Sequence, residues 1–119
     1  MKKLISLKQN KDFRRVYHRG KTIVCPWFVV YYMKNRAKCC KLGITAGKKI
    51  GNAVQRNRTK RVIRAAYSAV IDYVDVSACC YDFVIVARNR CVDAKSDFIA
   101  KKLYAALQNA GLIDGAQTD

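Results

Sequence analysis

The sequence predicts a single-domain α+β fold, an α/β sandwich, with elements in the order α-β-β-β-α-β-α. The chain has 119 residues, 51% of them hydrophobic, which suits one domain with one core. Three segments repeat apolar residues at the period of a helix, and the segments between them are rich in β-branched and aromatic residues. Internal repeats and low-complexity tracts do not occur, so one domain is assigned to residues 1–119.

The first predicted helix covers residues 10–19. Phe13, Val16 and Tyr17 are three and four residues apart and therefore share one apolar face of this helix. The other faces carry mainly Lys and Arg side chains, so we expect the helix to pack through one side and to expose basic residues on the others.

Two strands are predicted in residues 21–33, and a third in residues 39–46. Pro26 cannot donate to a strand ladder, so it separates a short strand from a longer one. The polar turn at residues 34–38 predicts that the third strand runs antiparallel beside the second. Along the longer strand, alternate side chains share one face, namely Trp27, Val29, Tyr31 and Met33.

The longest predicted helix covers residues 52–72, with Asn52 as its N-cap. Each residue advances the helix by about 100°, which sorts its side chains into two faces. One face is mostly apolar and is expected to pack: Thr59, Val62, Ile63, Ala66 and Val70. The other is basic: Arg56, Asn57, Lys60, Arg61 and Arg64, with Arg58 at the margin.

The last two elements are a strand at residues 81–88 and a helix at residues 95–110. The strand is apolar on both faces and is therefore predicted to be central and buried. The ordered part is expected to span about residues 7–111, with 112–119 as a flexible tail.

Positive charge is concentrated in the first part of the chain. The net charge is +16, and residues 1–71 hold 19 Lys and Arg but one Asp. A field of this size favours a polyanionic partner such as nucleic acid, with a merely solvated basic surface as the alternative. No apolar segment is long enough for a membrane span or a secretory signal, so we expect a cytoplasmic protein without a membrane partner.

The residues available for catalysis by the protein alone are few. His18 is the single histidine, the chain has no Glu, and its eight acidic residues are all Asp. General acids, bases, nucleophiles or metals are what an enzyme needs. We therefore assign no catalytic residue.

The six cysteines are predicted to be reduced thiols that pack as small apolar residues. Neighbouring cysteines in an extended chain point apart and chelate zinc poorly, so no metal ligand is assigned, although a zinc site is the alternative. Their positions are Cys25, Cys39, Cys40, Cys79, Cys80 and Cys91.

The basic residues around the long helix predict an RNA-binding surface. No acid occurs in residues 13–71, and Arg side chains pair with phosphates bidentately and stack on bases. Asn57 suits a base edge or a 2′-hydroxyl, or is simply exposed to solvent. The predicted RNA-binding residues are Lys48, Lys49, Arg56, Asn57, Arg58, Lys60, Arg61 and Arg64.

The segment KKIGNAVQRNRTKRVIR at residues 48–64 resembles the RNR motif of the bacterial ribonuclease P protein subunit. NKDFRRVYHRGK at 10–21 is similar to the first helix of that family, WFVVYY at 27–32 to its sheet aromatics, and DFVIVAR at 82–88 to its last strand. The resemblance covers most of residues 7–110. The two Cys-Cys pairs and the acidic tail depart from the family but lie outside the motif.

This resemblance implies a left-handed βαβ crossover around the long helix. It implies a subunit of a ribonucleoprotein endoribonuclease whose catalytic centre is RNA with bound Mg²⁺, so that the protein alone binds no cofactor. The expected partners are the catalytic RNA and precursor tRNA, whose 5′ leader the enzyme removes. No obligate protein partner is expected.

The resemblance also implies a cleft for the leader. Phe13, Tyr17 and Tyr31 match aromatics that line this cleft in the family, and Val29 shares the strand face of Tyr31 and is expected to form its floor. Flat rings can stack on unpaired bases without reading sequence. The alternative for Phe13 and Tyr17 is that they only pack their helix on the sheet.

Two other functions remain open at this point. One is a ribosomal-type RNA-binding structural protein, which is also small and basic. The other is a nuclease that acts without RNA. An open aromatic groove beside a basic helix favours the ribonuclease P subunit over the structural protein, which needs no such groove.

Overall fold

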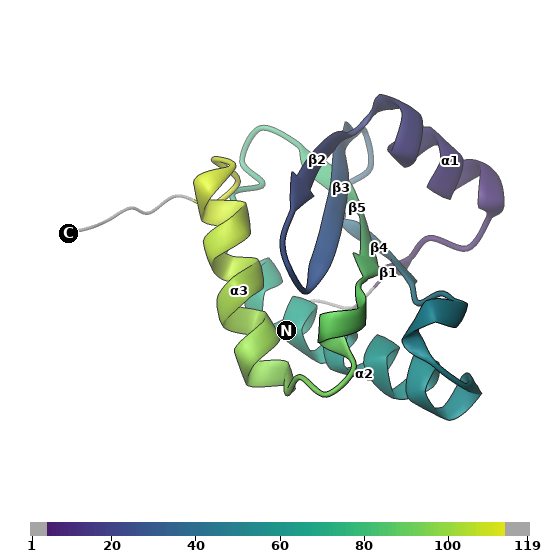
Figure 1. Ribbon diagram of the computed structural model, residues 1–119. Helices are drawn as coiled ribbons and strands as arrows, with labels where there is room; N and C mark the ends of the chain where they lie inside the picture. The colour runs from purple at the N-terminus through teal and green to yellow at the C-terminus, as the bar shows by residue number, and fades with distance from the viewer. Residues whose placement is uncertain (1–4, 114–119) are drawn as a thin grey trace.

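The computed structural model describes residues 5–113, in which a five-stranded mixed sheet packs with three α-helices (Figure 1). Every element predicted from the sequence is present. Along the chain they are β1 Ile5–Ser6, α1 Asn10–Arg19, β2 Lys21–Val24, β3 Phe28–Asn35, β4 Lys41–Thr45, α2 Ala53–Val70, β5 Cys80–Ala87 and α3 Ser96–Asn109. Short 3₁₀ turns lie at Lys48–Ile50, Ile71–Tyr73 and Asn89–Cys91.

β5 is the central strand of the sheet, whose order is β1-β4-β5-β3-β2. It is antiparallel to β3 from Cys80 opposite Asn35 to Ala87 opposite Phe28, and it is parallel to β4. The prediction of a buried central strand is confirmed. Its two apolar faces suit a strand that is covered on both sides.

The predicted pairing of β3 with β4 is wrong. The two strands run in opposite directions, but β5 lies between them. Neighbouring strands in sequence often pair, but here α2 carries the chain from β4 back to a parallel β5, which takes the central place. The left-handed sense of this β4–α2–β5 connection stays a prediction of the resemblance.

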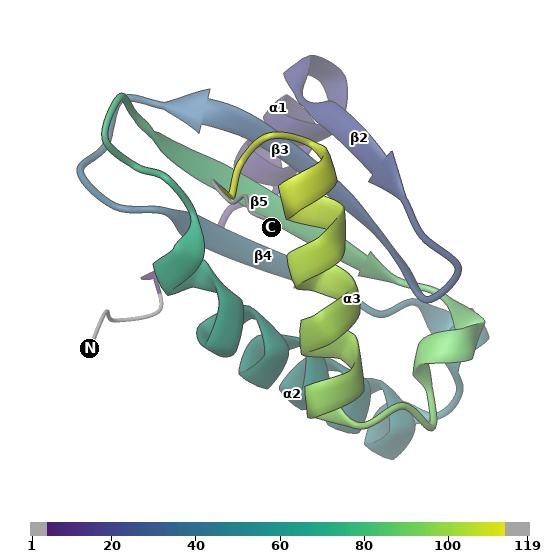
Figure 2. The same cartoon turned by 90° about the vertical axis from the view of Figure 1, so that its left-hand side faces the viewer.

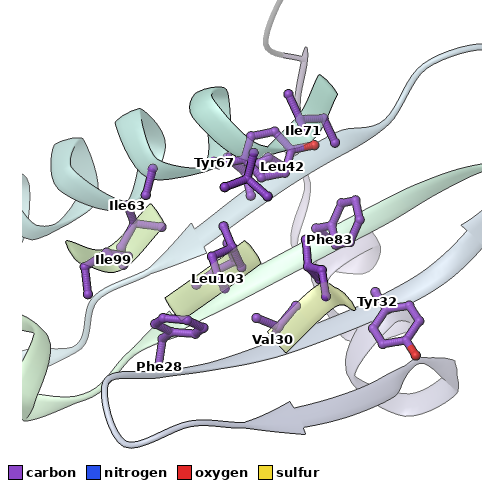
Figure 3. Close-up of a cluster of buried hydrophobic side chains, with 14 of the residues drawn as sticks. Phe28, Val30, Tyr32, Leu42, Ile63, Tyr67, Ile71, Phe83, Ile99 and Leu103 are labelled. Carbon is purple, nitrogen blue, oxygen red and sulfur yellow. The ribbon is translucent and has the colours of Figure 1, made fainter. Parts of the chain in front are cut away.

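Helices α2 and α3 cover one face of the sheet, and α1 covers the other (Figures 1 and 2). The larger core lies on the α2 and α3 side, where side chains from β3 and β5 meet those of the two helices (Figure 3). Its fully buried members include Phe28, Val30, Ile63, Phe83, Ile85, Ile99, Leu103 and Leu107. Burying each such side chain contributes about 1.5–3 kcal/mol relative to exposure.

The core beneath α1 is much smaller. Its buried members are Leu7, Val16 and Val84, and partly buried side chains surround them, namely Phe13, Tyr31, Met33 and Val86. The apolar face predicted for the first helix is thus confirmed, and it packs on the sheet through few residues.

Trp27 does not share the face of Tyr31, as the alternation along the strand predicted. β3 begins at Phe28, and the Trp27 ring contacts Phe98 of α3, with ring centroids 5.2 Å apart. Lys102 lies on the same rings, its Nζ 5.0 Å from the Trp27 centroid. The strand therefore starts one residue too late for Trp27 to follow the alternation.

Both predicted ends of the ordered region differ from the structure. β1, which was not predicted from the sequence, pairs in parallel with β4. Leu112 and Ile113 are 5% and 3% exposed, and Ile113 forms a bridge with Val74, so these two residues belong to the core rather than to a tail. Residues 114–119, the rest of the predicted tail, lie outside the described residues.

The six cysteines all lie within the described chain and are thiols, with Cys80 and Cys91 buried and the others half-buried. Burial raises the pKa of the Cys91 thiol to about 11 and also raises that of Cys25, which keeps both protonated at neutral pH. Within residues 5–113, no three His, Cys, Asp or Glu side chains are grouped so that they could hold a metal ion. No helix of this region is long and apolar enough to cross a membrane.

Candidate nucleic-acid interface

α2 presents its basic side chains beside the face that packs against the sheet, and Lys60 and Arg64 line a cavity next to β4. Asn57, Arg61 and Arg64 are exposed, whereas Arg56 and Lys60 are half-buried. The residues of this helix that are buried are Thr59, Ile63, Ala66, Tyr67 and Val70. The predicted division of the helix into an apolar and a basic face is confirmed.

The N-terminus of α2 is fixed by a capping box. The backbone N–H of Gln55 donates to Asn52 Oδ1, and the backbone N–H of Asn52 donates to Gln55 Oε1, both at 2.9 Å. The predicted N-cap is thus confirmed. Lys48 and Lys49 are exposed in the 3₁₀ turn just before it, so their charges add to the positive end of the helix dipole.

Two arginines of α2 donate to backbone carbonyls. Arg56 Nη1 lies 3.1 Å from the Gly51 oxygen, and Arg58 Nη1 lies 2.7 Å from the Val92 oxygen, in the segment that leads to α3. These contacts orient both guanidinium groups. Arg58 therefore also connects α2 to the segment before α3 by a hydrogen bond.

On the other face of the sheet, Tyr17 of α1 and Tyr31 of β3 form an edge-to-face pair. Their ring centroids are 4.9 Å apart and the rings are inclined by 82°. The Tyr17 hydroxyl is 3.2 Å from Thr45 Oγ1, at the end of β4. Tyr17 is 37% exposed, so part of its ring is available to a ligand.

Phe13 lies one helical turn before Tyr17, over Gly43 of β4. A Cβ atom at Gly43 would come within 2.5 Å of the Phe13 ring, so glycine lets the ring sit directly on the strand backbone. Phe13 is half-buried and packs against the small core. It thus combines packing with a partly exposed ring.

Val29 lies on the same face of β3 as Tyr31, two residues earlier, and is half-buried. Its partners in the neighbouring strands are Val24 and Val86. The structure places Val29 beside the aromatic residues along the strand, and its role as the floor of a cleft stays a prediction.

A cavity of about 1060 Å³ opens at the end of the sheet where β4 and β5 finish. Thr45 and Val86 connect it with the aromatic face. Its lining holds four basic residues and no acidic one; the basic residues are Lys48, Lys49, Arg88 and Arg90.

Arg88 and Arg90 were not predicted as site residues. Their position at the end of a buried strand could have indicated a binding role. The carboxyl ends of parallel strands meet at one edge of a sheet, and ligands bind there. Arg88 Nη1 donates to the Cys25 oxygen at 3.1 Å, which holds this side chain against the β2–β3 connection.

A second cavity of about 190 Å³ lies between the aromatic face and the basic face. Phe13 lines it from α1, Lys60 and Arg64 line it from α2, and β4 lies between them. Ser6 and Leu7 of the N-terminal segment complete the lining. The structure therefore brings one predicted leader-cleft residue, Phe13, and two predicted RNA-binding residues, Lys60 and Arg64, to the same cavity.

A comparison with protein families matches residues 1–111 to the model of the family described as Ribonuclease P. The chain belongs to the ribonuclease P protein family. This membership decides among the three functions that the sequence left open, in favour of a subunit of ribonuclease P. It also identifies the RNA of that enzyme as a partner.

Relatives of known name agree with this family. The chain is 38% identical to the ribonuclease P protein component of Streptococcus agalactiae over 117 residues, which covers 95% of this chain and 100% of that protein. It is 39% identical to the corresponding component of Clostridium botulinum over 106 residues, or 89% of this chain and 94% of the relative.

Solved structures of ribonuclease P proteins have the same fold. The protein from Staphylococcus aureus matches with a TM-score of 0.79 and 32% identity, covering 94% of this chain and all of that one. The protein from Thermotoga maritima matches with a TM-score of 0.75 and 25% identity, covering 87% and 96% of the two chains.

Proposed function

We propose that this ribonuclease P subunit binds the catalytic RNA through the basic face of α2 and the 5′ leader of precursor tRNA through the aromatic face under α1. Together these contacts help the RNA to remove the leader. The observation that carries the proposal is the cavity beside β4 that Phe13 lines together with Lys60 and Arg64. At this cavity the basic face of α2 adjoins the aromatic face under α1.

The basic face suits folded RNA because its charges are held on a capped and well-packed helix. Arg61 and Arg64 extend into solvent from a helix whose other side is buried, so they meet phosphates without loss of packing. Asn57 lies among them and supplies an amide for a base edge or a 2′-hydroxyl.

The aromatic face suits a single strand. Tyr17 and Tyr31 offer ring surfaces at one position, and the basic cavity beyond Thr45 continues from them with four cations for the strand's phosphates. Stacking on rings is independent of base identity, which suits leaders of varied sequence.

We also propose that the Mg²⁺ of the holoenzyme is held by the RNA. Asp12 of α1 and Asp82 of β5 carry carboxylates beside α1, and Arg15 Nη2 lies 3.1 Å from Asp12 Oδ1 and 3.6 Å from Asp82 Oδ2. This set of side chains does not fit a divalent cation bound by the protein alone. Cleavage is accordingly assigned to the RNA, and the protein supplies binding and orientation.

Reconstitution tests the proposal. Purified protein, catalytic RNA or both are mixed with precursor tRNA at low Mg²⁺, and leader release is measured. We expect cleavage when both components are present, because the protein's cations replace part of the counterions that the RNA needs. We expect no cleavage by the protein alone, because the proposal assigns cleavage to the RNA. Cleavage by protein shown to be free of RNA would contradict the proposal.

A further inference from the structure

A buried carboxylate lies between the sheet and α1. Asp82 is in the central strand β5 and is 4% exposed, and the other polar residue buried in residues 5–113 is Thr59. Asp82 Oδ1 accepts a hydrogen bond of 2.7 Å from Asn35 Nδ2, at the end of β3. Its other oxygen, Oδ2, lies 3.6 Å from Arg15 Nη2 of α1.

Arg15 therefore connects α1 to the sheet by charge. It lies on the helix between Phe13 and Tyr17, and the same Nη2 atom is 3.1 Å from Asp12 Oδ1. The Arg15 side chain is 41% exposed, whereas that of Asp82 is 5% exposed. A carboxylate this deeply buried needs a cation or hydrogen-bond donors, so α1 is favoured in the position that brings Arg15 to it.

This contact matters because the buried core beneath α1 is small. Val16 is the one residue of the helix that is fully buried, and the core beneath the helix has two other buried members, Leu7 and Val84. The Arg15–Asp82 ion pair therefore adds to the ring contacts of Phe13 and Tyr17 in fixing the distance and rotation of the helix relative to the sheet.

We infer that Asp82 is a positioning residue for leader binding. Together with Arg15, it holds α1 in the position that keeps Phe13 over Gly43 and Tyr17 against Tyr31. The inference rests on the proposed function, in which these rings bind the leader. Asp82 itself is buried and does not touch the RNA.

The test uses the holoenzyme reconstituted with Asp82→Asn, Arg15→Gln or the double variant. Asn keeps an acceptor for Asn35 and removes the charge, while Arg15→Gln changes a partly exposed side chain and is expected to fold. Arg14→Gln is the matched control, because Arg14 is the exposed neighbour on the same helix and its replacement changes the net charge equally.

The readout is the ratio of affinities for precursor and mature tRNA, measured well below the melting temperature of each variant. We expect both single variants to reduce this preference by about 2- to 30-fold, the range of couplings transmitted through a side-chain network. Arg14→Gln should keep the wild-type preference. The double variant should lose no more than the larger single loss, because both changes break the same contact.

A Tyr17→Ala holoenzyme separates failure of this inference from failure of the proposed function. If Tyr17→Ala loses the preference while Arg15→Gln and Asp82→Asn keep it, Asp82 has no positioning role and the leader site stands. Additive losses in the double variant would also overturn the linkage. If all these variants keep the wild-type preference, the aromatic face does not bind the leader and both proposals fail.

Discussion

The two surfaces of this protein differ in how their functional side chains are supported. The basic face of α2 belongs to a helix of 18 residues with a capping box and five buried residues. Its exposed side chains Asn57, Arg61 and Arg64 therefore extend from a helix that is held by other contacts. The aromatic face belongs to a helix of 10 residues with one buried residue, and its rings are themselves part of the packing.

This difference predicts different consequences of mutation. On α2, removal of the charge of Arg61 or Arg64 should change RNA binding without changing stability, whereas Arg58 also donates a hydrogen bond to the Val92 carbonyl. Under α1, the rings and the Asp82–Arg15 pair contribute to leader binding and to stability, so a mutation there should change both. Tyr17 is the exception, because it is the most exposed of the rings.

Replacement of Tyr17 by Ala should produce the largest change. Loss of base stacking costs about 1–3 kcal/mol, so precursor affinity should fall about 5- to 150-fold while mature tRNA affinity stays the same. Tyr17→Phe is the control, since it keeps the ring and removes only the hydroxyl that meets Thr45. Equal weakening of both tRNAs by Tyr17→Ala would show that the ring does not bind the leader.

Gly43→Ala should disturb Phe13 without touching the α2 face. The added methyl group overlaps the Phe13 ring, so the ring must move. We expect the free energy of unfolding to fall by up to about 3 kcal/mol. Leader preference should fall and binding to the catalytic RNA should not. A Gly43→Ala variant with wild-type leader preference would show that Phe13 does not contribute to leader binding.

Arg61→Ala and Arg64→Ala should each change how binding to the catalytic RNA depends on salt. For each phosphate that the variant no longer neutralises, the slope of log K against log salt should decrease in magnitude by about 0.7–0.9. Leader preference and melting temperature should stay at wild-type values. Lys101→Ala, on the exposed side of α3, should leave the slope unchanged. An unchanged slope in both Arg variants would mean that these residues are merely solvated.

The larger core should lose stability in alkali. Burial raises the pKa of Cys91 from its ordinary value of 9.0 to about 11 and raises the pKa of Tyr67 as well. The unfolded chain ionises first, so this stabilisation is complete below about pH 9 and is lost as pH rises through 11. Urea unfolding from pH 7 to 10.5 measures it, and Cys91→Ala should flatten the decline. A stability that does not fall above pH 9 would contradict the assigned burial.

The sequence predicted best those features that depend only on residues within one helix or strand. The faces of α2 follow from its periodicity, its start follows from Asn52, and the central place of β5 follows from apolar residues on both sides. The packing of Phe13, Val16 and Tyr17 was likewise predictable from their spacing. These features depend on nearby residues, which a single sequence displays.

The features that were missed depend on contacts between distant segments. β1 has two residues, too few to show a periodicity, and its partner β4 lies far along the chain. The insertion of β5 between β3 and β4 depends on where α2 returns the chain. The Asp82–Arg15 pair likewise could not be predicted, because an isolated Asp in a strand gives no indication of the cation that it meets.

The division of binding between the two surfaces is tested most directly by one crossed comparison. Wild-type, Tyr17→Ala and Arg61→Ala proteins are assembled with catalytic RNA, and the affinity for precursor tRNA is measured as the leader is lengthened from zero. We predict that affinity rises with leader length for wild-type and Arg61→Ala but stays flat for Tyr17→Ala, while Arg61→Ala alone changes the salt dependence of assembly. The same leader-length dependence in wild-type and Tyr17→Ala holoenzymes would contradict the account.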